Sequence, residues 1–226
     1  MPHTHLTFSD TADGSKTLYN AEVGEHYHSH HGALQESRHV FLQSGLKYFL
    51  EKHATKEVAI LEVGFGTGLN FLLTADYSLE NDIALHYTGI EAYPLSPEMI
   101  SLTNYGQYLS ADTWNSFLKN YSNSLKNPVQ IGPACTLEVI HRKLVEFTSA
   151  RQYDVIYFDA FAAARQPEMW TDDALKHICS YLKKGGVFVT YAITGNLKRS
   201  MKALGFSIEK APGAPGKREM LRAVKQ

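Results

Sequence analysis

A chain of 226 residues is long enough to bury a substantial core, and its 44% hydrophobic and 20% charged residues are typical of a globular protein rather than a disordered one. The sequence has no apolar run of the roughly 18 residues that a membrane span needs, and its polar start lacks the apolar segment of a signal peptide, so we expect a cytoplasmic protein. Its two cysteines, Cys135 and Cys179, lie far apart without a CxxC pattern, which disfavours a disulfide framework and a zinc site.

The net charge of −1 conceals a segregated distribution of charge. Residues 176–226 contain eleven lysines and arginines against two glutamates, a net charge of +9, which leaves −10 for residues 1–175. Such segregation can give a nearly neutral protein a basic face that suits a phosphate backbone. A solvated surface on late helices and turns is the alternative explanation of the same charges.

Residues 1–56 do not follow a repeating strand and helix pattern, and we interpret them as an N-terminal appendage. Short extended pieces occur at 6–8 and 16–19, and the apolar spacing after them predicts a helix over 34–50. Between these lies a histidine-rich stretch with His26, His28, His30 and His31. The first three alternate and would share one face of a strand, but no nearby acid or cysteine completes a ligand set. We therefore predict no metal and favour a polar wall near a substrate.

From Glu57 onward, strands and helices alternate. Apolar runs predict seven strands, at 58–63, 84–91, 135–140, 154–159, 187–193, 206–209 and 219–224. Helical patterns lie at 70–77, 97–102, 111–124, 172–182 and 196–204. We expect the helix over 172–182 to end in Lys183-Lys184-Gly185-Gly186, because cations and glycine favour a helix C-terminus. The alternation predicts an α/β domain over 57–226 with a doubly wound, mostly parallel seven-stranded sheet, whose ligands bind at the carboxyl ends of the strands.

The most specific motif is the turn between the first of these strands and its helix, Glu62-Val63-Gly64-Phe65-Gly66-Thr67-Gly68-Leu69-Asn70. Glycines let the backbone turn sharply and approach a ligand. The spacing departs from the dinucleotide fingerprint G-x-G-x-x-G, and the acid at the strand end would repel a pyrophosphate but suits a cation. An acid followed by G-x-G-x-G is the first motif of the Rossmann-like class I methyltransferases, whose cofactor S-adenosyl-L-methionine (SAM) carries a sulfonium. We predict SAM as the cofactor, with a nucleotide-binding or vestigial turn as the alternative. The cofactor-binding residues that we predict in this turn are Glu62, Gly64, Phe65, Gly66, Gly68 and Asn70.

Two further acids lie at predicted strand ends. Glu91 ends the second strand of the domain, where a carboxylate can accept hydrogen bonds from both ribose hydroxyls of the cofactor. Asp159 ends the fourth strand, beside the cofactor, where a carboxylate can hold an attacking amine. Because a primary amine has a pKa of about 10 and an unperturbed aspartate about 4, we expect Asp159 to position the amine rather than to remove its proton fully.

Phe161 follows this acid closely, and we expect its ring to contact the sulfonium or the amine through a cation–π interaction. The alternatives are that Asp159 caps a turn and that Phe161 belongs to the core.

Together these motifs resemble the methyltransferase domain of the bifunctional tRNA 5-methylaminomethyl-2-thiouridine biosynthesis protein. The stretches that carry the resemblance are Gln35-Glu36-Ser37-Arg38-His39-Val40-Phe41, the glycine turn continued to Phe71, Asp159-Ala160-Phe161-Ala162 with Pro167-Glu168-Met169-Trp170, and Gly216-Lys217-Arg218-Glu219-Met220-Leu221. The resemblance implies methyl transfer from SAM to the 5-aminomethyl group of the wobble (2-thio)uridine in tRNA. It implies that the three glycines and Glu91 hold the cofactor and that Asp159 is the active-site acid. Candidate contacts to the tRNA are Arg38, Arg165, Lys217 and Arg218.

Two features depart from the family pattern. The loop after the aspartate, usually F-A-P-A-K-N-P, reads Phe161-Ala162-Ala163-Ala164-Arg165-Gln166-Pro167, which keeps a cation but loses the first proline. The sequence also ends at Gln226, so we expect the flavin-dependent oxidase half of the family to be absent. In that case a separate oxidase or other upstream tRNA-modifying enzymes would supply the aminomethyl precursor.

Two other functions are compatible with parts of this pattern. An aminopropyltransferase of the spermidine-synthase type shares the glycine turn, the ribose acid and the later aspartate, but its turn usually reads G-G-G-x-G. A non-catalytic protein that binds tRNA or SAM could keep the fold without the reaction. The intact Glu62, Gly64, Glu91 and Asp159 argue against such a loss of activity.

Overall fold

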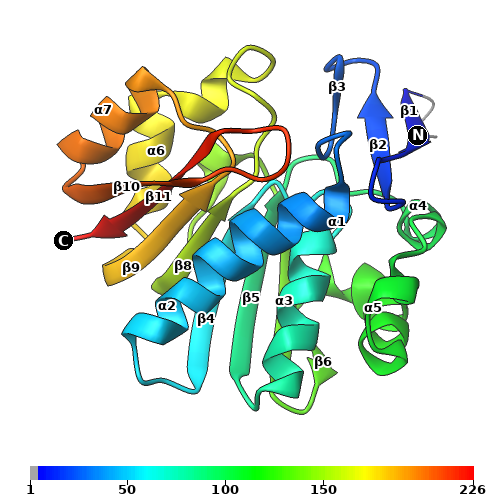
Figure 1. Cartoon of the computed structure of the whole chain (residues 1–226). Coiled ribbons are helices and arrows are strands. Elements are labelled where there is room, and N and C mark those ends of the chain that lie inside the picture. The colour runs from blue at the N-terminus through cyan, green and yellow to red at the C-terminus, as the bar shows by residue number, and fades with distance from the viewer. Residues whose placement is uncertain (1–4) are drawn as a thin grey trace.

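The computed structural model describes residues 5–226, and within these residues the strands form two sheets (Figure 1). The smaller has three antiparallel strands in the order β1-β2-β3, and the larger has eight strands in the order β10-β11-β9-β8-β4-β5-β7-β6. The strands are β1 (Leu6–Asp10), β2 (Lys16–Asn20), β3 (Glu25–His26), β4 (Glu57–Val63), β5 (Ala84–Glu91), β6 (Val129–Gly132), β7 (Cys135–His141), β8 (Tyr153–Phe158), β9 (Leu182–Thr190), β10 (Phe206–Pro212) and β11 (Glu219–Lys225).

The helices are of α, 3-10 and π type. The α-helices are α1 (Ala33–Glu36), α2 (Tyr48–Lys52), α3 (Leu69–Glu80), α4 (Pro97–Leu102), α5 (Ala111–Ser124), α6 (Asp172–Cys179) and α7 (Gly195–Ala203). The 3-10 segments are η2 (Tyr105–Tyr108), η3 (Leu144–Glu146) and η4 (Pro167–Trp170), and η1 (Ser37–Lys47) is a π-helix. Because α1, η1 and α2 follow one another without a gap, residues 33–52 form one continuous helical rod.

Serine and threonine side chains begin four of the helices. A hydroxyl at the N-cap accepts a hydrogen bond from a backbone N–H of the first turn, which otherwise has no partner. The pairs are Ser96 with Met99, Ser110 with Thr113, Thr171 with Ala174 and Thr194 with Leu197. These caps define where the helices after β5, β8 and β9 leave the carboxyl edge of the large sheet.

The five central strands of the large sheet, β9, β8, β4, β5 and β7, run parallel. At the two sides, β6 pairs antiparallel with β7, β11 with β9, and β10 with β11. Strand β4 is buried from Val58 to Val63, as a central strand covered on both faces should be. It pairs with β5 on one side and with β8 on the other, so the strand order reverses at β4. A binding crevice is therefore expected at the carboxyl ends of β4 and β8.

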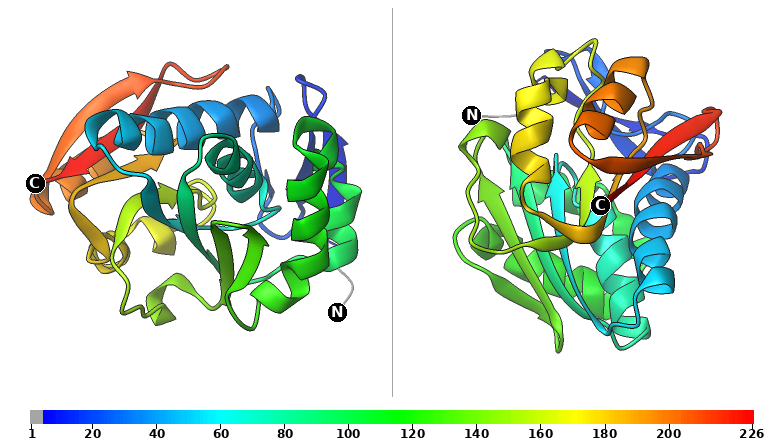
Figure 2. Two further views of the ribbon diagram at one scale, coloured as in Figure 1. Left: turned by 90° about the horizontal axis from the view of Figure 1, so that it is seen from below. Right: turned by 90° about the vertical axis from the view of Figure 1, so that its left-hand side faces the viewer.

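Helices cover both faces of this sheet (Figure 2). One face packs against the rod of residues 33–52, α3 and α5, and the other against α6 and α7. Strand β8 shows the alternation directly, because Tyr157 belongs to the first core whereas Ile156 and Phe158 belong to the second. Gly45 of η1 allows the rod to lie close to the sheet, since a Cβ there would be 2.7 Å from the ring of Tyr157.

The fold class predicted from the sequence is confirmed, with two corrections of detail. The sheet has an eighth strand among the described residues, β6, which was not expected because it is short and pairs only with β7 through an irregular register. Helix α6 ends at Cys179 rather than at 182, and β9 already begins at Leu182, which is buried and pairs with Tyr153. The Lys-Lys-Gly-Gly segment therefore lies inside β9, at a register shift, and does not terminate a helix.

The N-terminal residues pack as part of the same body. Sheet β1-β2-β3 lies at the carboxyl edge of the large sheet, and Leu18 of β2 shares a core with Val40 of the rod and Val58 of β4. The division of the chain at residue 56 stays a prediction from the sequence pattern. Among residues 5–226, no helix is long and apolar enough to cross a membrane.

Candidate active site

A cavity of about 1140 Å³ lies at the carboxyl ends of the central strands. Its walls come from the glycine turn after β4, from the segments that follow β5, β7, β8 and β9, and from the small N-terminal sheet. Gly64, Glu91 and Asp159 all line it, although 95 residues separate the first from the last in the sequence. The structure thus brings the three predicted motifs together around one space.

The glycine turn adopts left-handed backbone conformations, with φ of +83° at Gly64, +52° at Gly66 and +77° at Gly68. At Gly64, a Cβ would lie 2.4 Å from the carbonyl oxygen of Asp159, so only glycine lets the turn approach the end of β8 this closely. At Gly66, a Cβ would lie 3.0 Å from the ring of Tyr27, which also lines the cavity. The turn therefore forms a backbone cradle that any side chain would partly fill.

Glu91 reaches from the end of β5 to this cradle. Its Oε2 accepts a hydrogen bond from the backbone N–H of Gly66 at 2.9 Å, and its Oε1 accepts one from the N–H of Tyr93 at 2.9 Å. Burial raises the pKa of Glu91, while these backbone donors lower it. Because each carboxylate oxygen has two lone pairs, Glu91 can still accept hydrogen bonds from two ligand hydroxyls.

Asn70, in the first turn of α3, joins the two other acids. Its Nδ2 donates to Oε1 of Glu62 at 2.8 Å and to Oδ2 of Asp159 at 2.8 Å. Tyr87 donates its hydroxyl to the other oxygen of Glu62 at 2.8 Å. Glu62 is fully buried, which raises its pKa well above the usual value, and it does not line the cavity. Its influence on a ligand is therefore exerted through Asn70.

Of the two acids that Asn70 joins, Asp159 is the one that lines the cavity, and it is only partly exposed. Its backbone N–H donates to the carbonyl of Val63 at 2.8 Å, which fixes it directly after β8. Burial and, to a smaller extent, the negative charge of Glu36 raise the pKa of Asp159 to about 8, although Asn70 and Lys217 act in the opposite direction. From the sequence we expected an aspartate with an ordinary pKa of about 4. The raised pKa makes the ionised Asp159 a stronger proton acceptor than that expectation allowed.

Aromatic side chains stand beside this acid. The ring of Phe161 meets that of Tyr27 edge to face at a centroid distance of 5.3 Å, and both line the cavity. Trp170 donates from Nε1 to the carbonyl of Phe161 at 2.8 Å, and Tyr191 donates its hydroxyl to the carbonyl of Ala160 at 2.9 Å. The loop that carries Asp159 is therefore held by side chains of η4 and of the segment after β9.

Lys217 closes the cavity from the loop between β10 and β11. Its Nζ lies 2.7 Å from Oε1 of Glu36 and 3.9 Å from the ring centroid of Tyr191. The other oxygen of Glu36 accepts a hydrogen bond from the backbone N–H of Ser29 at 2.8 Å. Lys217 thus connects the C-terminal loop, the helical rod and the histidine-rich segment, next to Asp159.

The remaining predicted residues occupy different places. The ring of Phe65 is buried against Phe71 and Tyr121, so its side chain is mainly a core residue although it borders the cavity. Arg165 is exposed on the loop after Asp159 and lies against Gly24. Arg38 and Arg218 are exposed and do not line the cavity.

All four histidines of the histidine-rich stretch line the cavity, which is where a polar wall was expected. They differ in environment, since His28 is buried, whereas His30 is exposed and its ring centroid lies 4.1 Å from that of His31. Burial lowers the pKa of His28 to about 4, so its imidazole is neutral at physiological pH.

Sequence reasoning missed Tyr27, Glu36 and Tyr191 as residues of the cavity wall. Glu36 stands inside a stretch that carries the family resemblance, and Tyr191 lies near the end of the strand predicted over 187–193, directly after the observed end of β9 at Thr190. A polar residue at the carboxyl end of each central strand is a signal that could have identified the tyrosine. Tyr27, on an irregular segment, offers no comparable signal.

Comparison with known proteins places these features in context. A family model described as S-adenosyl-L-methionine-dependent methyltransferase matches residues 109–226. A protein of Magnetococcus marinus named tRNA 5-methylaminomethyl-2-thiouridine biosynthesis bifunctional protein MnmC is 33% identical over 228 residues, which cover 92% of this chain and 32% of that protein. A protein of the same name from Leptospira interrogans is 33% identical over 218 residues, covering 91% of this chain and 33% of that protein. The chain therefore spans about a third of the length of these curated relatives.

Solved structures also resemble this chain. The crystal structure of MnmC2 from Aquifex aeolicus superimposes with a TM-score of 0.78 at 26% identity, covering 97% of this chain and 70% of that one. The structure of DesVI from Streptomyces venezuelae has a TM-score of 0.50 at 11% identity, covering 85% of this chain and 92% of that one, and shows only a shared fold.

Proposed function

Because the chain belongs to the family of S-adenosyl-L-methionine-dependent methyltransferases, we propose that it methylates the 5-aminomethyl group of a wobble uridine or 2-thiouridine in tRNA. The product would be 5-methylaminomethyl(-2-thio)uridine. An amine as the methyl acceptor is supported by the partly exposed Asp159 at the cavity wall, whose pKa is raised to about 8. The tRNA is supported by the names of the relatives, which share about a third of their length with this chain.

The cavity is large enough for a cofactor and a nucleoside together. Pockets for one small ligand usually have about 300–1,000 Å³, and this one has about 1140 Å³. We propose that the backbone of Gly64, Gly66 and Gly68 holds SAM, with Glu91 as acceptor for its ribose hydroxyls. The left-handed turn fits this role because it leaves room where side chains would stand. When bound, SAM supplies an electrophilic methyl carbon on its sulfonium.

The role proposed for Asp159 follows from its hydrogen bonds. Asn70 occupies one carboxyl oxygen, Oδ2, whereas Oδ1 has no hydrogen-bond partner among the described residues and is free for an amine N–H. A primary alkylammonium has a pKa of about 10, so it must lose a proton before its nitrogen can act as a nucleophile. With a pKa of about 8, Asp159 accepts that proton more readily than an ordinary aspartate, whose pKa is about 4.

The neighbouring aromatic rings suit the charge that develops on the amine. Phe161 and Tyr27 line the same cavity as Asp159, and a cation within about 6 Å of an aromatic ring is stabilised by the ring quadrupole. We propose that Phe161 contributes in this way, while Lys217, held by Glu36, shapes the cavity rather than binding phosphate. The proposal places the protein in the cytoplasm, after a separate oxidase or another upstream enzyme that generates the aminomethyl group.

The test is incubation of the purified protein with methyl-labelled SAM and tRNA that carries 5-aminomethyluridine at the wobble position, followed by nucleoside analysis. We expect the label in 5-methylaminomethyluridine, and no label in the same tRNA without the aminomethyl group. Label that reaches only a small polyamine, or no acceptor, would refute the tRNA substrate. Transfer from decarboxylated SAM to a polyamine would instead identify an aminopropyltransferase.

A further inference from the structure

The ammonium group of Lys217 occupies a site formed by two other side chains of the cavity wall. Its Nζ lies 2.7 Å from Oε1 of Glu36 and 3.9 Å from the centroid of the Tyr191 ring. A carboxylate and the face of an aromatic ring are groups that hold ammonium cations in proteins. Because all three residues line the cavity, a primary alkylammonium is already bound within it.

Glu36 and Tyr191 are held in place by contacts that do not involve Lys217. The side chain of Glu36 is 7% exposed, and its Oε2 accepts a hydrogen bond from the N–H of Ser29 at 2.8 Å. Tyr191 donates its hydroxyl to the carbonyl of Ala160 at 2.9 Å. The two groups would therefore keep their positions if the lysine ammonium left.

Lys217 itself comes from the loop between β10 and β11, and its side chain can leave without opening that loop. The N–H of Gly213 donates to the carbonyl of Arg218, and the N–H of Lys217 donates to that of Ala214, so the loop backbone is fixed by its own hydrogen bonds. The side chain of Lys217 is 34% exposed, and its ammonium stands on a flexible aliphatic stem. Rotation of this stem carries the ammonium into solvent while the loop stays in place.

The ammonium site lies close to Asp159, the proposed proton acceptor. Burial is the main cause of the raised pKa of Asp159, the charge of Glu36 raises this pKa as well, and the charge of Lys217 lowers it. Burial also raises the pKa of Tyr191, and the charge of Asp159 raises it further. The ammonium of Lys217 is therefore within electrostatic reach of the carboxyl that would take a proton from a substrate amine.

The site lies on the side of Asp159 away from the groups proposed to hold SAM. In the sheet order β9-β8-β4-β5, Tyr191 follows β9 and Asp159 follows β8, whereas the glycine turn follows β4 and Glu91 ends β5. SAM also carries a primary ammonium, in its amino-acid tail. The order of the strands favours the methyl acceptor, rather than this tail, as the occupant of the site.

We propose that Glu36 and Tyr191 bind the amine of the acceptor nucleoside, and that Lys217 fills this site in the free protein. The inference rests on the proposed function, because the CH₂–NH₃⁺ end of a lysine is the same chemical group as a protonated 5-aminomethyl substituent. The substrate ammonium takes the place of the lysine ammonium, which moves into solvent. A proton of the bound amine then passes to Asp159, and the amine nitrogen becomes free to act as the nucleophile.

The first test asks whether K217A binds the group that it has lost. n-Propylammonium reproduces the atoms that this substitution removes, and a ligand that binds only the folded protein raises Tm as its concentration increases. We expect n-propylammonium chloride to raise the Tm of K217A above the effect of sodium chloride at equal ionic strength, and 1-propanol to have no such effect. If K217A alone is unfolded, the recovered folded fraction gives the same answer.

Two variants serve as controls for this binding. E36Q/K217A lacks the carboxylate and should bind n-propylammonium about 10- to 150-fold more weakly than K217A, the range for a hydrogen bond to a charged group. K183A removes a lysine from the ion pair with Asp154, which lies outside the cavity. Its Tm should gain no more from n-propylammonium than that of the wild type.

The second test connects the site with the reaction. In methyl transfer by K217A, n-propylammonium should compete with tRNA that carries the aminomethyl group and should leave the Kd for SAM unaltered. The KM of E36Q/K217A for this tRNA should be about 10- to 150-fold above that of K217A, for the same loss of a charged partner.

The outcomes separate this inference from the proposed function. If the wild-type protein transfers no methyl group to tRNA, the proposed function fails, and the assignment of the site to the acceptor fails with it. If the wild type is active but n-propylammonium does not stabilise K217A, or binds E36Q/K217A equally well, the amine site is refuted while the proposed function stands. Competition of n-propylammonium with SAM instead of tRNA would assign Glu36 and Tyr191 to the cofactor and overturn the inference.

Discussion

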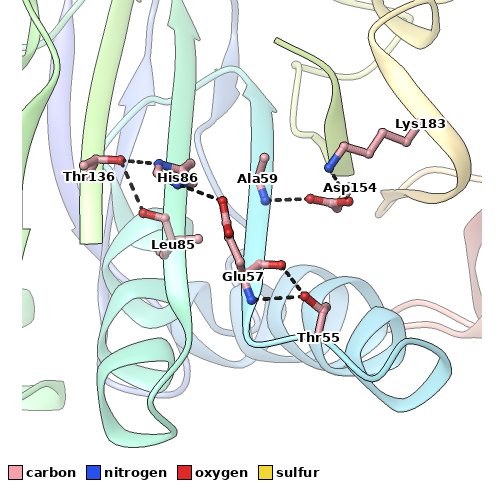
Figure 3. A network of polar contacts seen from close by, with 8 residues as sticks. All are labelled: Thr55, Glu57, Ala59, Leu85, His86, Thr136, Asp154 and Lys183. Carbon is pink, nitrogen blue, oxygen red and sulfur yellow. Dashed lines mark hydrogen bonds and ion pairs between the residues drawn. The ribbon is translucent and has the colours of Figure 1, made fainter. Parts of the chain in front are cut away.

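The two edges of the large sheet carry polar residues in opposite ways. At the amino edge, Asp154 on β8 lies 2.8 Å from Lys183 and also accepts a hydrogen bond from the N–H of Ala59, while Glu57 lies 3.3 Å from His86 (Figure 3). Each acid there has a basic partner and access to solvent. At the carboxyl edge, Glu62 and Asp159 share one amide, burial raises the pKa of both, and the negative charge of Asp159 raises the pKa of Glu62 further.

The difference shows which end of the fold is arranged for its own stability and which for a ligand. Acids that face one another without a cation cost free energy when ionised in a buried site. That cost is reduced when a positively charged or hydrogen-bonding ligand binds among them. Glu62 and Asp159, when ionised, therefore lack a full set of partners without a ligand, whereas Asp154 and Glu57 at the amino edge have theirs within the protein.

The largest expected effect is a loss of catalysis when the acid at the carboxyl end of β8 is removed, in contrast to removal of the acid at its amino end. Replacing Asp159 by alanine should lower kcat for methyl transfer to tRNA by about 10²- to 10⁴-fold, the range for loss of a positioned proton acceptor. Cofactor affinity should stay within about tenfold, since Glu91 and the glycine turn remain. Both are measurable by single-turnover transfer and by titration with SAM. D154A, at the amino end of β8, is the matched control and should keep kcat within about twofold, measured where the variant is folded.

An equal loss of kcat in both variants would remove the distinction between the edges. A complete loss of SAM binding in D159A would assign Asp159 to the cofactor rather than to the amine.

The next effect concerns the ion pair that closes the cavity. In K217M, the buried carboxylate of Glu36 loses its cation, and breaking a fully buried pair costs about 3–5 kcal/mol. Because the side chain of Lys217 is 34% exposed, we expect a smaller loss of about 1–3 kcal/mol in the free energy of unfolding, measured in urea. The neutral pair E36Q/K217M should recover most of it. If the losses of the single variants simply add, the two side chains are not coupled and this ion pair does not hold the C-terminal loop.

A third expectation concerns pH. Asp159 has a pKa of about 8 in the folded protein and about 4 when unfolded, so folding takes up a proton between these values and stability falls as pH rises from about 4 to about 8. In D159N this contribution is absent. The melting temperature of D159N minus that of the wild type, without ligand, should therefore increase from pH 5 to pH 8. A difference that stays constant over this range would mean that Asp159 ionises as easily in the fold as in the unfolded chain.

How far the sequence alone leads can be judged at individual residues. The alternation of strands and helices is a local pattern, and it was sufficient for the fold class and for the edge at which the cavity lies. The contacts of Gly64 and Glu91 follow from the same reasoning, because strand ends of a parallel sheet converge. Neither the register that joins Glu91 to Arg142 nor the role of Asn70 between two acids leaves a local signal, since each depends on where separate strands end.

The loops and charges were less predictable for a related reason. Lys217 was a candidate phosphate contact because the C-terminal region is basic, and this stays a prediction; its ion-pair partner Glu36, 181 residues away in the sequence, left no local signal. Lys183 was expected to end a helix, yet it lies within β9 at a register shift and its ammonium binds Asp154. Net charge over a segment counts cations but does not show which are neutralised by distant acids.

The smallest expected effect is that of removing Lys183 at the amino edge of the large sheet. This variant tests whether the amino edge is independent of the active site. Lys183 is about half exposed, and an exposed ion pair contributes about 0–1 kcal/mol, less at high salt. K183A leaves Asp154 in place, with its Oδ2 still bound to the N–H of Ala59 and its Oδ1 open to solvent. The free energy of unfolding should therefore fall by less than about 1 kcal/mol in urea titrations, and this loss should shrink as salt is added. Methyl transfer should be unaffected, because the cavity lies at the opposite end of the strands. A larger loss, or a fall in kcat, would show that the amino edge supports the site and that the two edges are not independent.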